Sequence, residues 1–484
     1  MPPCFSRLFL VFLFASCWST GNSQGVDVTL PPREPVRLVA EFCANCHGPY
    51  LTGNVAPNLL DTLSNHGTDD ESVTRSIRDG WPLSGMPAFG HLMSEAELSS
   101  VVAYIRRQTS AFRFGQIPAP LPPSEGPRRS ELHTFKVETL VDGLDTPWGI
   151  EFLPGYENRM LVTERAGRLR VIENGRLVAE PIRGLPKIWV KQDGGLLDVT
   201  IHPRYAENGW IYLAFSEAGV QPETSMTVVV RGRIKDGEWV DQQDIFRPSP
   251  EMFWANNSHF GCRFLWDQNE NLFYTFGDRG KPYLAQDIST PFGKIHRVRD
   301  DGRPAPDNPL LFQTGALGTI WSYGNRHVQG LAFHPQTGRL WATEHGPRGG
   351  DELNRIEPGR NYGWPVISYG KSQIGETIHG TEYPGMEQPI VHWTPAIAAG
   401  ALNFYTGDRF PRWKNHLFLA SLAHQELRRI ETDGDRVTHQ EILIKNEGRV
   451  RDVVTGPGGY IYVAFNNPGR IARLVPVTET TTTP

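Results

Sequence analysis

The hydrophobic and polar positions of the chain follow one pattern near the N-terminus and a different pattern in the rest. Near the N-terminus, Leu98, Val101, Val102 and Ile105 recur at helical spacing, which predicts an amphipathic helix over residues 95–108. A shorter helical stretch is predicted over residues 35–43. This part of the chain is therefore expected to form a small all-α domain.

From residue 132 to residue 475, short β-rich runs are broken by Gly, Pro, Asn and Asp at fairly regular intervals. Six of these runs repeat the same order of strand, tight turn and strand. The six pairs are 148–154 with 160–164, 197–203 with 210–214, 264–267 with 272–276, 330–335 with 339–344, 402–405 with 416–420, and 450–457 with 460–464. The second part of the chain is expected to be mainly β.

The repetition of one hairpin favours a radial arrangement, because a lone hairpin cannot bury its apolar face but repeated hairpins can. Six units over about 345 residues give about 57 residues for each four-stranded blade. The sequence therefore predicts a six-bladed β-propeller. A two-sheet sandwich is the alternative, but it does not need so many copies of one hairpin.

A proline-rich segment separates the two parts and contains Pro118, Pro120, Pro122, Pro123 and Pro127. Such a segment favours extended geometry and acts as a semi-rigid spacer. The expected organisation is an N-terminal domain over residues 34–110, a linker over 111–130 and a propeller over 131–477.

Residues 1–25 resemble an export signal, with Arg7 before an apolar stretch and small or polar residues after it. The stretch is too short to span a membrane. Residues 14–17 loosely resemble a lipoprotein cleavage box, which would make Cys17 a lipid anchor, but the usual leucine is missing. We expect a periplasmic or secreted protein. A net charge of −5 argues against a nucleic-acid partner.

Residues Cys43-Ala44-Asn45-Cys46-His47 form the attachment signature of c-type haem. The two thiols bind the haem covalently and His47 becomes an axial ligand of the iron. A zinc site would need a second ligand pair, and the only later cysteine is Cys262. A thioredoxin-like dithiol would lie beside a βαβ pattern, which is missing here.

Met86, in the run Ser84-Gly85-Met86-Pro87, is predicted to be the second axial ligand, because methionine raises the potential of electron-transfer haems. Its separation from His47 is 86 − 47 = 39 residues, enough chain to wrap the haem. Met93, His66 and His91 are the alternatives. Met93 precedes a helix start and can equally be a hydrophobic staple, and the two histidines lie in polar surroundings.

Polar residues at strand ends of a propeller converge on its central channel, where chemistry is expected. His259 and Asp278 flank the third hairpin and can act as a general base with an acidic partner. Arg326 precedes the fourth hairpin, and Arg449 and Arg451 precede the last; arginines together suit a carboxylate-rich ligand. A structural hydrogen bond is the alternative for each residue alone.

A glycine-rich turn follows the fourth hairpin, over residues 345–354. It exposes backbone carbonyls, and Asp351 with Glu352 adds carboxylate oxygens, the ligand type that calcium prefers. The spacing is not that of an EF-hand.

Two resemblances account for these features. Residues 36–108 resemble a small class I cytochrome c. The region from Leu144 to Leu474 is similar to the glucose/sorbosone dehydrogenase family, specifically the soluble aldose sugar dehydrogenases that depend on pyrroloquinoline quinone (PQQ). The shared phrases are residues 194–199, 259–261, 276–280, 329–333, 344–353, 361–369 and 449–453.

The resemblance to this family implies roles for the candidate residues. His259 would take the proton from the sugar hydroxyl and Asp278 would orient its imidazole. Arg326 would stabilise charge that develops over PQQ, and Arg449 and Arg451 would pair with its carboxylates. The further roles implied are calcium at the carbonyls of Gly346 and Pro347, where it would polarise the reacting carbonyl, and a second, structural calcium site at Glu352 and Tyr362.

Three positions depart from the family pattern, all in the expected cofactor pocket. Asp193 stands where the family has glutamine, His327 follows Arg326 in place of asparagine, and Ala423 replaces a lysine that pairs with PQQ. The missing cation and the added carboxylate are expected to weaken PQQ binding, or to suit another ligand.

These observations predict a haem-containing quinoprotein oxidoreductase. It would oxidise a sugar or alcohol with PQQ and pass electrons singly through its haem to an external acceptor. One alternative is a calcium-dependent propeller lactonase, because fold does not determine function. Another is a propeller that only binds carbohydrate and carries the cytochrome.

Overall fold

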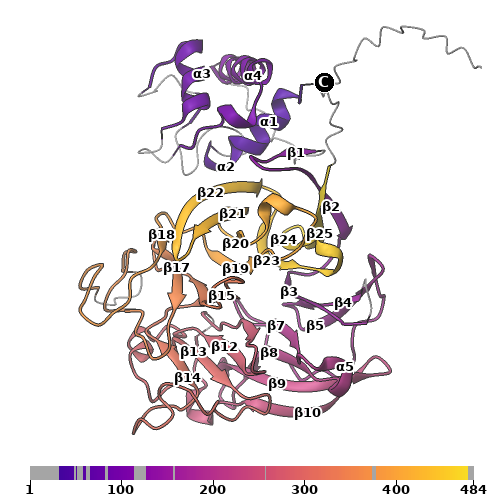
Figure 1. Ribbon diagram of the computed structural model, residues 1–484, viewed down its shortest axis with the longest axis vertical. Coiled ribbons are helices and arrows are strands. Elements are labelled where there is room, and N and C mark those ends of the chain that lie inside the picture. The colour runs from indigo at the N-terminus through magenta and orange to yellow at the C-terminus, as the bar shows by residue number, and fades with distance from the viewer. Residues whose placement is uncertain are drawn as a thin grey trace, which may run out of the picture.

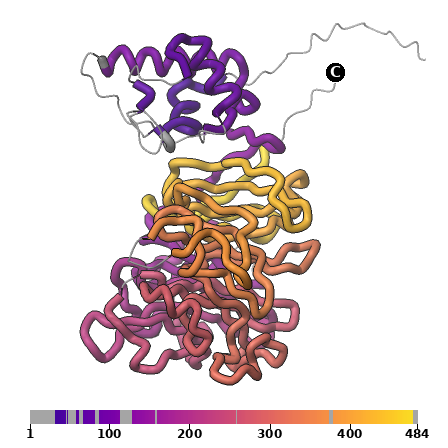
Figure 2. Tube along the Cα trace, turned by 90° about the vertical axis from the view of Figure 1, so that its left-hand side faces the viewer, coloured from indigo at the N-terminus to yellow at the C-terminus, as the bar shows by residue number. Residues whose placement is uncertain are grey.

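A computed structural model of the chain describes residues 32–47, 51, 58–60, 66–81, 86–113, 127–155, 159–256, 258–372 and 378–477. These residues form a small helical domain and a large β domain (Figure 1). The perpendicular view in Figure 2 shows the helical domain against one side of the β domain. The predicted export signal and the residue Cys17 lie outside the described residues.

The helical domain contains α1 (Pro35–Phe42), α2 (Ala44–His47), α3 (Asp70–Asp79), η2 (Gly90–Leu92) and α4 (Glu95–Arg113). The apolar face of α4 packs on Leu38 and Val39 of α1, as its spacing predicts. Glu97 reinforces the start of α4, because its carboxylate accepts a hydrogen bond from the backbone N–H of Ser94 at 2.9 Å. The helix continues past residue 108 to Arg113. Helix α3 is mostly polar and was not predicted from the sequence.

The β domain is built from six sheets, which are the blades of the propeller (Figure 1). Blades one to five have four strands each among the described residues. They are β3 (Pro147–Phe152), β4 (Arg159–Glu164), β5 (Arg168–Glu173) and β6 (Arg176–Leu177); β7 (Leu196–Ile201), β8 (Ile211–Ala218), β9 (Ser225–Lys235) and β10 (Glu238–Phe246); β11 (Phe264–Trp266), β12 (Leu272–Phe276), β13 (Lys294–Val298) and β14 (Ile320–Tyr323); β15 (Val328–Phe333), β16 (Leu340–Glu344), β17 (Asp351–Ile356) and β18 (Val391–Trp393); β19 (Ala399–Phe404), β20 (Leu417–Ser421), β21 (Glu426–Asp433) and β22 (Arg436–Lys445).

Blade six joins the two ends of the β domain. It contains β1 (Arg128–Arg129), β2 (Thr134–Val141), β23 (Arg449–Thr455), β24 (Ile461–Asn466) and β25 (Arg470–Pro476). β2 pairs antiparallel with β25, so that Val137 lies opposite Leu474. Pairing of the first long strand with the last closes the ring and leaves no open sheet edge between the ends.

The fold class predicted from the sequence is confirmed. Each of the six predicted hairpins forms the two inner strands of one blade. The innermost strands are almost entirely buried because the neighbouring blades cover both of their faces; β7 and β15 are examples. Apolar side chains from adjacent blades pack together between the sheets, as Trp413, Phe418 and Phe465 do between blades five and six. The short elements outside the sheets are α5 (Tyr205–Asn208), η3 (Pro250–Met252), η4 (Pro282–Ala285), η5 (Pro411–Trp413) and η6 (Pro457–Gly459).

A buried arginine connects four blades across the central axis. The guanidinium of Arg263 lies 3.2 Å from a carboxylate oxygen of Asp198 in blade two and 3.2 Å from one of Asp452 in blade six. It also donates to the backbone carbonyls of Gln329 and Arg451, each at 2.9 Å. Arg263 thereby joins the innermost strands of blades two, four and six to its own blade three.

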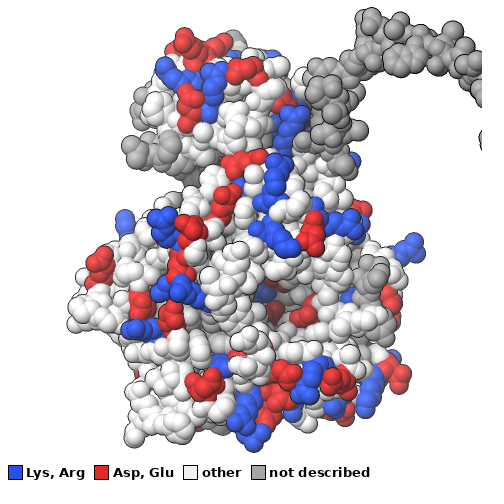
Figure 3. Space-filling view, viewed as in Figure 1, with Lys and Arg blue, Asp and Glu red and all other residues white. Residues whose placement is uncertain are grey.

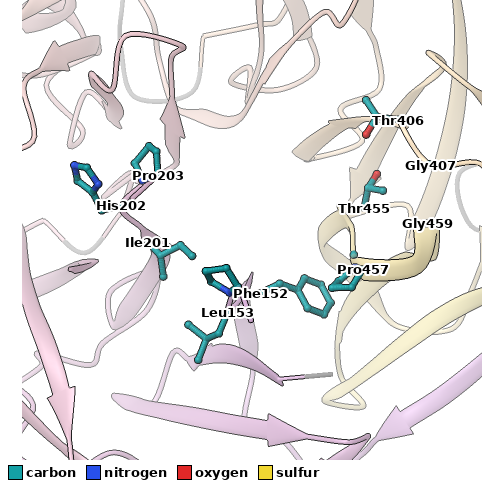
Figure 4. Close-up of a pocket in the computed structure, with 12 residues that line it drawn as sticks. Phe152, Leu153, Ile201, His202, Pro203, Thr406, Gly407, Thr455, Pro457 and Gly459 are labelled. Carbon is teal, nitrogen blue, oxygen red and sulfur yellow. The ribbon is translucent and has the colours of Figure 1, made fainter. Parts of the chain in front are cut away.

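One end of the channel holds a pocket of about 560 Å³ (Figure 4). It is lined by residues that follow the inner strands, including Leu153, Pro203, Thr406 and Thr455. The candidate catalytic residues precede these strands or follow the second strands, so they lie at the opposite end. The pocket in Figure 4 is therefore not the candidate active site.

In the described part of the chain, no helix combines the length and the apolar character needed to cross a membrane. Helix α4 runs three residues beyond the predicted domain boundary at 110, and β1 and β2 bring the chain into blade six from residue 128. The linker over residues 111–130 stays a prediction, because residues 114–126 lie outside the described residues.

Candidate active site and haem site

His259 and Asp278 lie together at the channel end of blade three. The Nδ1 atom of His259 is 2.6 Å from an Asp278 carboxylate oxygen. The same carboxylate accepts from the backbone N–H of Gly280 at 2.9 Å and from Trp364 Nε1 at 2.7 Å. Burial opposes ionisation of Asp278, but His259 and Arg326 hold its pKa below the ordinary value. The carboxylate therefore stays charged and directs the other ring nitrogen, Nε2, outward.

The backbone around His259 is shaped for this contact. His259 has a φ of 54°, a conformation that few residues other than glycine adopt. Gly277 passes so close that a Cβ atom there would overlap the His259 carbonyl oxygen. The glycine before Asp278 therefore lets strand β12 bring the carboxylate up to the imidazole.

Arg326 and two further histidines surround this pair. Arg326 Nη1 donates to the carbonyl oxygens of His345 and Gly346, at 3.2 and 2.8 Å. The ring of His327 stacks on His259, with 4.9 Å between centroids, and the ring of His345 meets His327 edge-on at 5.1 Å. Burial lowers the pKa values of His327 and His345 well below the ordinary value, and the neighbouring cations lower them further. Both rings are neutral.

Arg449 and Arg451 come from the start of β23 and face the same space. Burial lowers the pKa of both, and the two guanidinium groups and Arg165 repel one another. Asp193 opposes this effect at both arginines and at Arg279, whose pKa burial lowers to about 9. Because arginine keeps its proton in proteins, these shifts indicate positive charge that one carboxylate does not fully balance.

The geometry fits an anionic, carboxylate-rich ligand. Within the described residues, Arg451 Nε, His345 Nε2 and His327 Nδ1 are buried without a hydrogen-bond partner. Buried donors normally have partners, so a ligand with several acceptor oxygens would satisfy them. Asp193 lies among the arginines. Its carboxylate therefore balances part of their positive charge, although it would also repel an anionic ligand.

The predicted calcium ligands give a weaker fit. The carbonyl of Gly346 already accepts from Arg326, and no described cluster of three or more His, Cys, Asp or Glu side chains could hold a metal ion. The carbonyls of Gly346 and Pro347 would therefore need ligand atoms from a bound cofactor. Burial and the adjacent Glu344 raise the pKa of Glu352 to about 8, so its carboxyl holds a proton at neutral pH unless a bound cation replaces that proton.

Tyr362 can contribute to a second calcium site only through its backbone carbonyl. Its hydroxyl donates to the carbonyl of Arg355 at 2.6 Å and accepts from the N–H of Glu357 at 2.8 Å. Both calcium sites stay predictions.

The residues predicted to hold a haem lie at the end of α1, on α2 and in the segment that carries Met86. Cys43 follows α1 and is buried, and its side chain faces the core of the helical domain. His47 ends α2, and the side chain of Cys46 lies outside the described residues. Met86 is partly buried against the same core, and its backbone pairs with Trp81. Cys43 and Met86 thus share one apolar core and His47 ends the next helix, an arrangement that fits a haem.

The alternative axial ligands have other contacts. Met93 is buried in the apolar core, as expected of a staple residue. His66 stacks on Trp81 with 3.9 Å between ring centroids. His91 lies 3.3 Å from the carboxylate of Glu131, a residue of the β domain. These contacts favour Met86.

Comparison with known families matches both domains. The family model for glucose/sorbosone dehydrogenase matches residues 144–473, which is more than half of the chain. The chain belongs to the glucose/sorbosone dehydrogenase family. A second model, for the cbb3-type cytochrome c oxidase subunit III, matches residues 31–105 and identifies a cytochrome c domain.

Relatives of the dehydrogenase domain include enzymes of known type. Aldose sugar dehydrogenase YliI of Escherichia coli is 38% identical over 350 residues, covering 71% of this chain and 93% of that protein. An apo crystal structure of the E. coli aldose sugar dehydrogenase superimposes with a TM-score of 0.66 at 36% identity, covering 71% of this chain and all of that chain. The PQQ-bound aldose sugar dehydrogenase of Streptomyces coelicolor gives a TM-score of 0.57 at 25% identity, covering 74% of this chain and all of that one.

Three residues of the dehydrogenase domain's site escaped sequence reasoning. Arg165 lies near Asp193, because its guanidinium donates to the carbonyl of Gln192. Arg279 and Trp364 bracket Asp278. Arg165 directly follows the first predicted hairpin. Arg279 and Trp364 lie in motifs that the chain shares with the family, but they were not assigned a role. The position of Arg165 directly after an inner hairpin could have identified it as a site residue.

Proposed function

We propose that this protein is an oxidoreductase that oxidises an aldose sugar, or a related alcohol, with PQQ and transfers the electrons to its own c-type haem. The observation that supports this most is the His259–Asp278 pair next to an arginine cluster with excess positive charge, in a chain with a haem-attachment motif. The names of the E. coli and S. coelicolor relatives support the substrate class and the cofactor.

The protein would bind the cofactor through its own cations. Arg449, Arg451 and Arg165 would pair with the carboxylates of PQQ, and Arg326 would lie beside its reacting carbonyl. When bound, PQQ supplies an acceptor for the hydride from the substrate carbon. Calcium at the carbonyls of Gly346 and Pro347 would polarise that acceptor. The absence of a lysine at Ala423 would leave these arginines to hold the anion.

His259 would remove the proton from the substrate hydroxyl. Its Nδ1 atom is held by Asp278, so Nε2 is the nitrogen that receives the proton. The Asp278 carboxylate then stabilises the charged imidazole, while Trp364 Nε1 and the N–H of Gly280 fix its position. His327, neutral and stacked on His259, keeps the ring in its plane.

The electrons and protons balance with a one-electron acceptor outside the protein. One sugar CH–OH group loses a hydride and a proton, which together are two electrons and two protons. The haem iron takes one electron at a time, so it must be reduced and reoxidised twice for each sugar. An external ferric or cupric electron carrier would reoxidise it, and both protons leave to water.

Reduction of the haem by substrate tests the proposal. We expect the absorption bands of the ferrous haem to appear when an aldose is mixed with protein loaded with PQQ and calcium. H259Q should abolish this change while leaving the ferric spectrum and PQQ binding intact. A loaded wild-type protein whose haem stays ferric with every aldose and alcohol tried would contradict the proposal, and failure of PQQ to bind would favour the carbohydrate-binding alternative.

A further inference from the structure

The helical domain packs against the outer rim of the propeller and not over either end of its channel. Figure 1 shows α1 and α2 above β22 and beside β1, and Figure 2 shows the indigo and purple helical domain next to the yellow C-terminal blades. Helix α1 contacts β22, the outermost strand of blade five. Cys43 and His47, which follow α1, are therefore near the junction of blades five and six.

An ionic cluster lies where the two domains meet. Glu41 of α1 lies 3.8 Å from Arg33 of the same domain, and Arg128 of β1 and Glu447 are near enough to shift its pKa. Arg128 forms an ion pair with Glu447 of the β22–β23 loop, and these two residues are only 3% and 7% exposed. Burial raises the pKa of Glu41, and the two arginines oppose this. Buried charges are costly unless they are paired, so the position of Glu41 beside the Arg128–Glu447 pair is specific.

A second, more exposed contact lies beside it. His91 of the helical domain is 3.3 Å from the carboxylate of Glu131, which precedes β2. The same carboxylate is held by Arg429 of β21 at 2.8 Å and by His439 of β22 at 2.7 Å. Figure 3 shows Lys, Arg, Asp and Glu side chains gathered at this waist between the domains.

The buried cluster lies close to the cofactor pocket along the chain. Glu447 is in the interface, and Arg449 and Arg451, two and four residues later, face the pocket. Gly448 between them has a φ of 118° and a Cβ there would meet the Asn466 carbonyl at 2.9 Å, so this turn suits glycine. Across blade five, three strand spacings separate β22 from β19, roughly 14 Å at about 4.8 Å for each spacing.

We propose that the Glu41–Arg128–Glu447 cluster holds the haem domain in the position from which it accepts electrons, with residues 447–451 as the shortest protein link between the haem domain and the cofactor pocket. This inference rests on the proposed function. The interface would serve electron transfer from the propeller to the haem. The exposed face of the helical domain would then be free to contact the external acceptor.

Charge reversal at Arg128 tests the inference, and the neighbouring residue provides the control. R128E would place three carboxylates together, whereas R129E makes the same charge change at an exposed position on the same strand. We expect R128E to reduce its haem at least tenfold more slowly after mixing with an aldose, and R129E less than twofold. Sugar oxidation with a soluble dye as acceptor should stay at the wild-type rate in both variants.

Two further measurements make the result independent of activity and of a folding defect. Small-angle X-ray scattering of the full-length protein should show a larger maximum dimension for R128E than for wild type or R129E. H91A, at the exposed contact, should slow haem reduction two- to fivefold without disturbing a buried group.

Haem reduction at the wild-type rate in R128E and H91A would overturn the inference, whatever the scattering shows. If wild-type protein oxidises no sugar with the dye, the proposed function fails. The docking role is then decided by scattering alone, and equal dimensions for R128E and R129E would overturn it.

Discussion

Asp278 is held at three points, and its charge is the part of this arrangement that the proposed chemistry needs. D278N keeps the size of the side chain but presents an amide to His259, which favours the wrong tautomer of the imidazole. We expect kcat for sugar oxidation to fall roughly 10²- to 10⁴-fold with little change in the affinity for PQQ.

Trp364 offers the matched control for this change. W364F removes the hydrogen bond to the other oxygen of Asp278 but leaves the carboxylate charged. Its effect on kcat should be below that of D278N. Equal losses would mean that Asp278 acts through packing and not through its charge.

Arg165 is expected to offset the lysine that is missing at Ala423. R165Q removes one cation from the cluster around Asp193, and a charged hydrogen bond contributes about 1.5–3 kcal/mol. We therefore expect the dissociation constant of PQQ, measured by titration calorimetry, to rise at least tenfold. R168Q removes an arginine whose partners are Glu164 and Asp145 and should leave PQQ binding unchanged.

Between elements, Arg263 supports the innermost strands of four blades. R263M would leave Asp198 and Asp452 buried without their shared cation, which costs about 3–5 kcal/mol in the free energy of unfolding. The triple variant with D198N and D452N should recover most of this loss, since no buried charge is then left unpaired. Denaturant unfolding followed by tryptophan fluorescence measures both, and a triple variant as unstable as R263M would contradict this account.

The start of α4 is expected to make the helical domain sensitive to acid. Burial opposes ionisation of Glu97, but hydrogen bonds from Arg33 and the backbone of Ser94 lower its pKa to about 2. A lowered pKa in the folded state adds stability that is complete above about pH 4.5 and is lost as the pH falls toward 2. E97Q should lower the thermal midpoint of this domain at pH 6, followed by circular dichroism, and the difference from wild type should shrink by pH 3.

At the same scale, the hydrophobic pattern predicted the inner hairpin of every blade but not the outer strands. The inner strands are buried on both faces and read as apolar runs, whereas much of β10 and of the first half of β22 is exposed and polar. Helix α3 escaped for a similar reason, because little of it is buried. His259 and Asp278 were predictable since they flank one hairpin. Arg165 and Trp364 reach the site from other blades. Their positions depend on how the blades pack together, which a local sequence pattern does not show.

For the whole molecule, the propeller is expected to fold without the helical domain. The E. coli relative's entire chain aligns with 71% of this one, so a complete protein of this family needs no cytochrome domain. A protein containing residues 127–477 should oxidise aldoses with a dye, and lose transfer to an external cytochrome. A form starting at residue 142 is the contrast, because it lacks β2 and should not fold. Loss of dye activity in the longer form would show that the helical domain supports the site itself.

The pairing of β2 with β25 also has a consequence for how the protein is made. During synthesis the predicted haem-binding cysteines emerge first and the partner of β2 emerges last. The edge of β2 therefore stays unpaired while five blades are made. The haem thiols need no such wait, since their domain is complete before the first blade begins. Cytochrome maturation can therefore precede closure of the ring, and any stall in synthesis before residue 470 leaves a mature cytochrome attached to an aggregation-prone, unclosed propeller.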